Sequence, residues 1–137
     1  MSYLVIDTNI FISSFIQPKG NPGKVFKIVA VDERIELCYN DKILSEYLEV
    51  ASREKFKKYN FDMDEIRGVI SDIRETGHLV NPPKSDMYFV DESDRIFYDT
   101  AIASGATLVT GNMKHYPPNE LFIMTASEYV QLREQDT

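Results

Sequence analysis

The chain contains little of what several protein classes require. Its single cysteine, Cys38, cannot form an internal disulfide, which excludes a small disulfide-stabilised secreted fold. Six glycines and six prolines are too few for a fibrous or low-complexity chain. No apolar run approaches the ~20 residues that span a bilayer, and the apolar segment 3–6 reaches Asp7 too soon for a secretory signal. We therefore expect one globular cytoplasmic domain over residues 1–137, with no membrane partner.

Positive charge is also scarce. Fifteen Lys and Arg residues stand against 22 Asp and Glu residues, which gives a net charge of −7. Neutralisation of phosphates dominates the affinity of proteins that coat nucleic acids, so a protein of this kind is normally basic. The bulk charge excludes a general nucleic-acid coat, and it leaves open a local basic rim around a small site.

Short apolar runs alternate with amphipathic segments along the whole chain. The runs predict strands at 3–6, 35–39, 78–81, 106–110 and 121–124. Helical spacing of apolar residues predicts helices at 9–16, 24–31, 42–56, 62–77, 91–104 and 126–134. Alternation of this kind is typical of an α/β fold, with a parallel sheet covered by helices on both faces. Ligands of such folds bind outside the carboxyl ends of the strands.

Oxygen-bearing side chains occur at these positions. Asp7 follows the first predicted strand directly, and Asn112 follows the strand at 106–110. Asp94 shares a helix face with Phe97 and Tyr98, and Glu46 borders the apolar stripe of its helix. Each residue alone also has an ordinary structural interpretation, as a helix cap, a turn residue or a solvated edge residue. A buried carboxylate is unfavourable unless it is paired or binds a metal, so the set favours a site.

Three segments resemble the PIN domain family, and within it the toxin components of prokaryotic toxin–antitoxin systems. These are Val5-Ile6-Asp7-Thr8-Asn9-Ile10-Phe11-Ile12-Ser13, Ile43-Leu44-Ser45-Glu46-Tyr47-Leu48-Glu49-Val50, and Asp91-Glu92-Ser93-Asp94-Arg95-Ile96-Phe97 with Gly105-Ala106-Thr107-Leu108-Val109-Thr110-Gly111-Asn112. Each motif is weak singly, but their order and spacing along the whole chain are specific. The resemblance implies a three-layer, Rossmann-like α/β domain with about five parallel strands.

The resemblance also implies roles for individual residues. It assigns Asp7, Glu46 and Asp94 as catalytic and metal-binding acids, with Asn9 and Thr110 as supporting polar residues. Asn112 stands where many PIN proteins have a fourth acid, which removes a negative charge and puts a second metal site in doubt. Asp91 is a candidate to compensate for it, although a capping role is favoured. The implied activity is hydrolysis of RNA phosphodiester bonds by an endoribonuclease.

Converging carboxylates repel one another, and oxygen ligands select hard cations, so Mg²⁺ or Mn²⁺ is the expected cofactor. Neither His78 nor His115 lies in a zinc-type spacing.

A receiver domain is excluded because Asn81-Pro82-Pro83 follows the third strand, and a haloacid-dehalogenase-type phosphatase is disfavoured by Asn9. The open alternatives are a housekeeping RNA-processing nuclease and a catalytically weak RNA- or protein-binding scaffold.

The expected partners are RNA and, for a toxin, a cognate antitoxin protein; related proteins commonly form homodimers. Substrate phosphates require positive charge at the rim of an acidic site. The candidate RNA contacts are Lys19, Lys24, Arg53, Lys55, Lys57, Lys58, Arg95 and Lys114, of which Lys24, Arg53, Arg95 and Lys114 are favoured.

Overall fold

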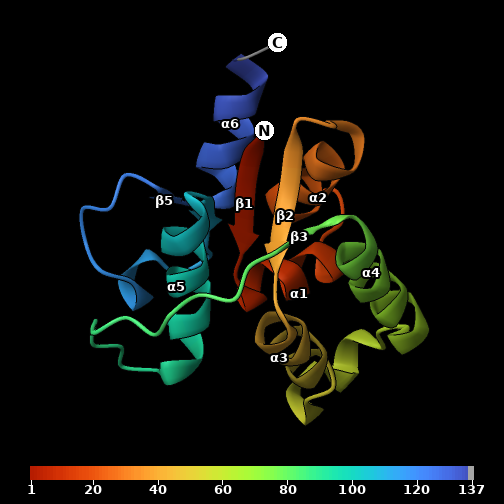
Figure 1. Ribbon diagram of the computed structural model, residues 1–137. Helices are drawn as coiled ribbons and strands as arrows, with labels where there is room; N and C mark the ends of the chain where they lie inside the picture. Colours follow the sequence, from red (N-terminus) through yellow and green to blue (C-terminus); the bar gives the residue numbers. More distant parts are fainter. Residues whose placement is uncertain (136–137) are drawn as a thin grey trace.

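The computed structural model describes residues 1–135, which form a parallel five-stranded sheet between two layers of helices (Figure 1). All neighbouring strands pair in parallel, in the order β3-β2-β1-β4-β5. The strands are β1 (Ser2–Ile6), β2 (Ile35–Tyr39), β3 (His78–Leu79), β4 (Thr107–Val109) and β5 (Ile123–Met124). The predicted α/β class, the parallel sheet and the three-layer architecture are confirmed.

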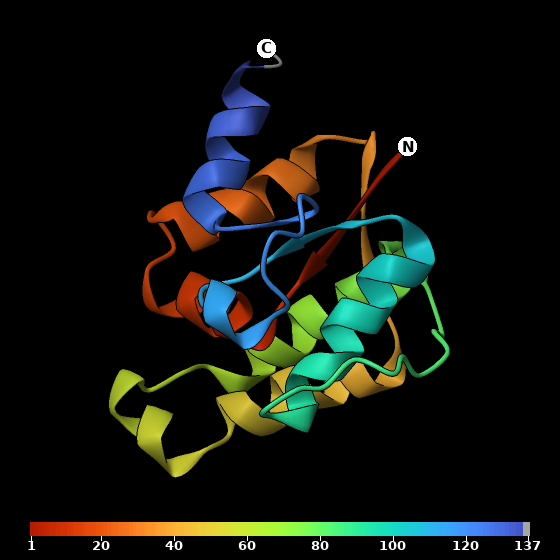
Figure 2. The same cartoon turned by 90° about the vertical axis from the view of Figure 1, so that its left-hand side faces the viewer.

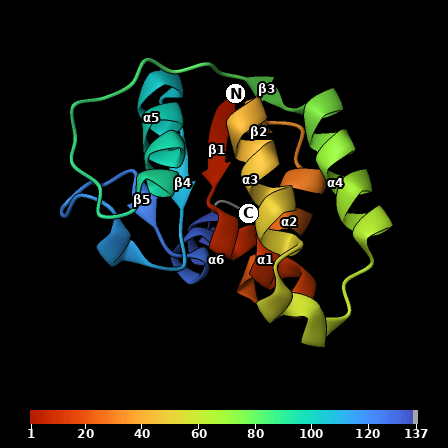
Figure 3. The ribbon, with the colours of Figure 1, turned by 90° about the horizontal axis from the view of Figure 1, so that it is seen from below.

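Six α-helices and three short 3₁₀ helices connect the strands within the described residues. Helix α5 packs on β1, β2 and β4 from one side, whereas α2 and α6 pack together on the opposite side (Figures 2 and 3). The α-helices are α1 (Thr8–Ile16), α2 (Asn21–Val31), α3 (Asp41–Ala51), α4 (Met63–Thr76), α5 (Arg95–Ser104) and α6 (Ala126–Gln135). The 3₁₀ helices are η1 (Glu54–Tyr59), η2 (Glu92–Asp94) and η3 (Met113–His115).

Polar side chains fix where the helices begin. Asn40 caps α3 by accepting a hydrogen bond of 3.0 Å from the Ile43 N–H. Thr125 and Glu128 form a reciprocal capping box at the start of α6, with hydrogen bonds of 3.1 and 3.0 Å. Gly105 ends α5 at a φ of 69°, a conformation that favours glycine. These signals are local, because each depends only on residues within four positions of a helix end.

The prediction of one helix over 42–56 is wrong at its end. Helix α3 stops at Ala51, where the Ser52 hydroxyl donates to the Leu48 carbonyl at 2.8 Å and Arg53 takes an extended backbone conformation. Phe56, in η1, then packs with Tyr59 and Phe61 at ring-centroid distances of 6.2 Å. The aromatic cluster holds η1 beside the carboxyl edge of the sheet, where a continued helix would not lie.

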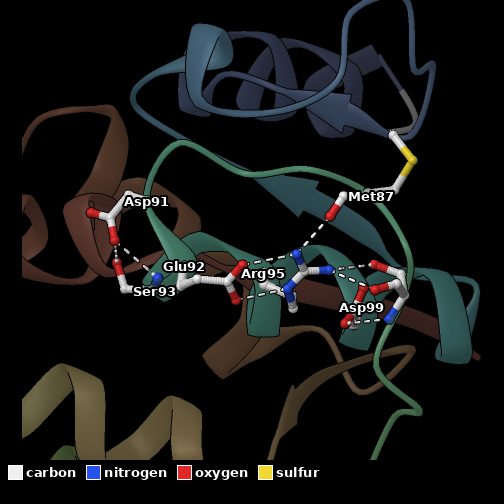
Figure 4. Close-up of polar contacts among 7 residues, drawn as sticks. Met87, Asp91, Glu92, Ser93, Arg95 and Asp99 are labelled. Carbon is white, nitrogen blue, oxygen red and sulfur yellow. Dashed lines mark hydrogen bonds and ion pairs between the residues drawn. The ribbon is translucent and has the colours of Figure 1, made fainter.

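A segment without regular structure, residues 80–90 and hereafter the strap, runs from β3 across α5 to η2 (Figure 1). The Arg95 guanidinium holds it by donating to the Ser85 carbonyl at 2.7 Å and to the Met87 carbonyl at 2.6 Å (Figure 4). Glu92 accepts two further hydrogen bonds from the same guanidinium, at 2.8 and 2.9 Å. The strap therefore has a defined path over the surface.

The core lies on both faces of β1 and β4. Leu4, Val5 and Ile6 are at most 1% exposed, as a strand covered on both sides requires. The thiol of Cys38 is free and buried in β2. None of the helices in residues 1–135 is both long and apolar enough to cross a membrane.

Candidate functional site

The carboxyl ends of β1 and β4 bring Asp7 against Thr110. Asp7 caps α1, with its Oδ1 accepting a hydrogen bond of 3.2 Å from the Ile10 N–H. Its Oδ2 accepts a hydrogen bond from the hydroxyl of Thr110, a residue that is fully buried. The Asn112 N–H donates to the same hydroxyl at 3.0 Å. The backbone of both strand ends thus fixes the direction of the Asp7 carboxylate.

Asp94 lies at the junction of η2 and α5, with a side chain that is 17% exposed. Although it occupies the cap position of α5, its carboxylate forms no capping hydrogen bond. Asp91 does the capping of η2 instead, accepting from the Ser93 N–H at 2.9 Å and from the Ser93 hydroxyl at 2.8 Å. This division of roles confirms the capping function expected of Asp91 and leaves the Asp94 carboxylate available to a ligand.

Glu46 is carried to the same edge of the sheet by α3. The neighbouring residue, Tyr47, donates its hydroxyl to the carbonyl of Ile6 and stacks on Phe11 at a centroid distance of 4.1 Å. These contacts attach α3 to the end of β1. Figure 3, which views the molecule from the end toward which β1 points, shows α3 between α5 and α4, and α3 contacts both helices.

A cavity of about 190 Å³ lies where these elements meet. All three predicted catalytic acids line it, together with Asn9, Asp91 and Arg53. Thr110 and Asn112 are not part of the lining and support it from behind through the hydrogen bonds to and from the Thr110 hydroxyl. The structure therefore brings together side chains that the sequence separates by many residues.

The electrostatics of the cavity oppose the charged form of its acids. Burial raises the pKa of Asp7 to about 6, and hydrogen bonds from Thr110 and the Ile10 N–H partly offset that rise. Burial also raises the pKa of Asp94 to about 6; the nearby His115 lowers it, whereas the charges of Asp91 and Asp7 raise it. Burial and then the charge of Glu49 raise the pKa of Glu46. A bound cation would oppose the rise in pKa of all three acids, because a nearby positive charge favours the ionised carboxylate.

The chemistry of the site fits a hydrated Mg²⁺ or Mn²⁺ ion better than a closed protein cage. Among residues 1–135, no three His, Cys, Asp or Glu side chains form a group of metal-binding geometry. Mg²⁺ usually retains several waters and takes only one or two carboxylates directly. The Thr8 hydroxyl also lines the cavity, is buried and has no hydrogen-bond partner within the described residues. An unpaired buried hydroxyl of this kind fits a site whose polar occupant completes it.

Sequence reasoning missed several residues of the cavity. His115 lines it, with Nδ1 3.5 Å from Asp94 Oδ2 and Nε2 2.9 Å from the side-chain nitrogen of Asn112. Phe56 also reaches it from η1, next to Lys55, which is one of the candidate RNA contacts. The position of His115, three residues after Asn112 and thus beyond the end of β4, is the signal that could have identified it.

The candidate RNA contacts do not all lie at the cavity. Arg53 lines the cavity, although its guanidinium also pairs with Glu49 at 2.9 Å. Arg95 is only 12% exposed because it binds the strap, and Lys24 lines a different groove between α2 and α6. Lys114 is exposed on η3, beside His115 and outside the cavity lining.

Comparisons with known proteins agree with this geometry. A family model described as the PIN domain matches residues 3–114. An uncharacterized protein of Methanocaldococcus jannaschii, MJ1680, is 31% identical over 109 residues, which cover 80% of this chain and 70% of that protein. The match to the family model extends from β1 into η3, and so includes every acid that lines the cavity.

A solved structure shares the fold. The crystal structure of VapBC2 from Rickettsia felis, bound to a DNA fragment from its promoter, superposes with a TM-score of 0.60. The alignment covers 90% of this chain and 98% of that one, at 15% sequence identity. Identity at that level establishes a common architecture and nothing about residue roles.

Proposed function

The chain belongs to the PIN domain family, and on that basis we propose that it is a metal-dependent ribonuclease acting as the toxin of a toxin–antitoxin pair. The observation that carries the proposal is the cavity at the carboxyl ends of β1 and β4, where Asp7, Glu46 and Asp94 meet. Burial raises the pKa of two of these acids to about 6, so their charged forms are less favourable than in water and an occupant of positive charge would stabilise them.

Asp7 and Asp94 are the residues that would hold the ion. When bound, Mg²⁺ or Mn²⁺ supplies positive charge that favours attack of water on a phosphodiester and stabilises the departing oxygen. Thr110 fixes the Asp7 carboxylate, and Glu46, across the cavity, orients the attacking water. Asn112 positions Thr110 through its backbone N–H, while its side chain caps η3 by accepting from the Lys114 N–H at 3.2 Å.

RNA as substrate is supported by the cations at the mouth of the cavity. Arg53 and Lys55 line it, and the Lys55 ammonium lies 5.1 Å from the ring centroid of Phe56, which also lines it. A local cluster of cations with an aromatic ring suits the phosphates and unstacked bases of a single strand. Because the net charge is −7, we expect this binding to be weak and to fall with added salt.

The toxin role rests on the resemblance to PIN toxins and on the architecture shared with VapBC2. It predicts an antitoxin encoded beside this gene that covers the cavity, and it is compatible with a homodimer. Induced expression of the parent chain should arrest bacterial growth, whereas the Asp7→Asn variant should not. A parent chain that cleaves RNA without arresting growth would instead favour a housekeeping RNA-processing role.

A catalytically weak scaffold is the second candidate. One observation favours it: Asn112 stands at the end of β4, where many PIN proteins have an acid. The burial of Asp7 and Asp94 opposes it, because a scaffold gains no stability from desolvated carboxylates.

The decisive experiment is cleavage of a mixed-sequence RNA with Mg²⁺ or Mn²⁺. Asp7→Asn and Asp94→Asn should each reduce the rate about 100-fold or more, since loss of an ion ligand removes several kcal/mol of transition-state stabilisation. Asp72→Asn, at an exposed acid of α4, is the matched control and should cleave like the parent. Equal rates for the parent and both site variants would reject the proposed nuclease.

A further inference from the structure

A second cavity, larger than the catalytic one, lies between α3, α5 and the strap. Its volume is about 570 Å³, within the range of small-molecule sites. Glu46 and Ser93 line both cavities, so the two cavities adjoin. A strand of RNA with a phosphate in the catalytic cavity can therefore place a neighbouring nucleotide in this second cavity.

The lining of the second cavity includes a buried carboxylate, that of Asp99, with one oxygen that has no hydrogen-bond partner among the described residues. Asp99 is 5% exposed, and its Oδ2 accepts a hydrogen bond of 3.1 Å from the Ser85 N–H. Its Oδ1 is buried and has no hydrogen-bond partner among the described residues. Leaving a carboxylate oxygen unpaired away from water is unfavourable, which makes Oδ1 the natural partner of a ligand donor.

The distribution of unpaired buried atoms supports this interpretation. In residues 1–135, three side-chain polar atoms are buried without a partner: Thr8 Oγ1, Tyr116 OH and Asp99 Oδ1. Thr8 lines the catalytic cavity, and the Tyr116 hydroxyl lies near enough to Asp7 to lower the pKa of that acid. The first two atoms thus mark the catalytic site, and the third marks the cavity beside it.

The walls of the second cavity are preformed. Arg95 donates to the carbonyl and to the hydroxyl of Ser85, at 2.7 and 3.1 Å, while Asp99 accepts from the N–H of that residue (Figure 4). Ser85 is therefore fixed from two sides, and the strap cannot move away without breaking these bonds. This arrangement keeps Asp99 at a constant position relative to Glu46 and the catalytic cavity.

The remaining lining suits a nucleotide. Lys42 and Lys84 are exposed at the cavity, where their charges help to lower the pKa of Glu92, another residue of the lining. Neither lysine forms an ion pair within the described part of the chain, so both ammonium groups can also contact a phosphate. Asn81 adds an amide that can both donate and accept. A carboxylate oxygen accepts only, and an exocyclic amino group is the base donor that suits it best. Uracil has no such group, and its one free N–H, at N3, lies between two carbonyl oxygens that repel a carboxylate.

We propose that this second cavity is a base-binding subsite of the nuclease, in which Asp99 Oδ1 accepts a hydrogen bond from the exocyclic amino group of a nucleotide next to the cleaved bond. The inference rests on the proposed ribonuclease function and names its base preference. Cytosine and uracil give the sharpest comparison, because an amino group on one is replaced by a carbonyl oxygen on the other.

The test is equilibrium binding of fluorescent 12-nucleotide oligo-C and oligo-U RNA at pH 7.5 with Mg²⁺, in the Asp7→Asn chain to prevent cleavage. Oligo-C should bind about tenfold more tightly than oligo-U, because one hydrogen bond to a charged acceptor has an effect of this size. Adding Asp99→Asn keeps an acceptor for the Ser85 N–H and presents an amide donor instead of Oδ1. This second substitution should abolish or invert the preference for oligo-C over oligo-U.

Two further variants and one modified RNA separate the base contact from general effects. Lys84→Ala should weaken the binding of both RNAs by a similar factor. Lys27→Ala, which replaces an exposed lysine of α2, should change the binding of neither. Oligo-N4,N4-dimethylcytidine lacks the amino hydrogens and should bind like oligo-U, a result that does not depend on how Asp99→Asn folds.

Equal binding of oligo-C and oligo-U, an unchanged ratio with Asp99→Asn, or no RNA binding at all would overturn the subsite. The cleavage assay on the parent chain is read separately. A parent that cleaves RNA without a C/U difference leaves the nuclease standing and overturns the subsite alone. A chain that prefers oligo-C through Asp99 while the parent cleaves nothing supports the subsite and overturns the nuclease.

Discussion

The Thr110 hydroxyl donates a hydrogen bond to the Asp7 carboxylate across a sequence separation of 103 residues. The contact joins the ends of β1 and β4, the two neighbouring strands at whose carboxyl edge the cavity opens. It also relieves part of the cost of burying Asp7, because a hydrogen bond to the ionised form lowers the pKa of that acid.

Thr110→Val should therefore impair catalysis without unfolding the chain. Valine has a similar shape but cannot donate, and a hydrogen bond to a charged group contributes about 1.5–3 kcal/mol. We expect kcat to fall about tenfold or more, with KM for RNA nearly unchanged, because Thr110 holds Asp7 and does not line the cavity. Thr110→Ser retains the hydroxyl and should restore most of the rate. Valine and serine variants of equal activity would contradict the role assigned to this residue.

Asp7→Asn should stabilise the metal-free protein at neutral pH. The pKa of Asp7 is about 6 in the folded state against an ordinary value of 3.8, so the folded state binds more protons than the unfolded state between these values. Stability of the parent in EDTA should then fall as pH rises from about 4 to about 6 and stay low above it.

The amide of the variant does not ionise, so this decline should shrink. A pKa difference of this size corresponds to at most about 3 kcal/mol at pH 8, and the variant should gain part of it. Urea denaturation in EDTA at pH 4 and pH 8 measures the effect. A variant that is less stable than the parent at pH 8 would show that Asp7 is compensated by groups of the protein itself.

Mg²⁺ or Mn²⁺ should raise the melting temperature of the parent chain. An ion that binds only the folded state at 100 times its Kd adds about 2.7 kcal/mol. Asp7→Asn and Asp94→Asn should show little of this increase, and Asp72→Asn should show all of it. Thermal melts with and without each ion make the comparison. If the parent and both site variants respond alike, the ions bind elsewhere, and the scaffold interpretation gains ground.

Arg95→Met should release the strap. Methionine fills similar space but leaves the carbonyls of Ser85 and Met87 without their donor. Limited proteolysis within residues 80–90 should accelerate, and the free energy of unfolding should fall by about 2 kcal/mol, the effect of losing hydrogen bonds to a charged group. Arg67→Met, on exposed α4, is the matched control and should match the parent in both measurements. Unchanged proteolysis of Arg95→Met would mean that the strap is held by other contacts.

Much of the fold is predictable from local pattern. Continuous apolar runs identify β1 and β4 because strands covered on both faces need them, and the Thr125–Glu128 spacing marks the start of α6 because capping is a local interaction. The same logic placed Asp7 at a strand end. The end of α3 escaped prediction because the apolar spacing continues to Phe56, whose ring packs with the aromatic cluster of η1 and not along the helix.

The candidate site was predictable only in part, since local pattern does not report which distant residues meet. The resemblance to the family identified Glu46 as a site residue. Its place at the border of the apolar stripe of its helix is equally typical of a solvated surface residue. No pattern indicated that Asp99 is buried beneath the strap, or that Arg95 faces the strap carbonyls, because both depend on a path of residues 80–90 that has no periodic signal. Their roles follow from tertiary contacts with Ser85.

The burial of Cys38 has a practical consequence for following the molecule by spectroscopy. Its thiol is 1% exposed and burial raises its pKa, so maleimide reagents should leave it unmodified. The chain also has no tryptophan. A cysteine introduced at Tyr88, which is 84% exposed on the strap, would thus carry a fluorophore as a single label. A tryptophan introduced at Phe56 would be the sole indole and would report stacked RNA bases at the cavity by quenching.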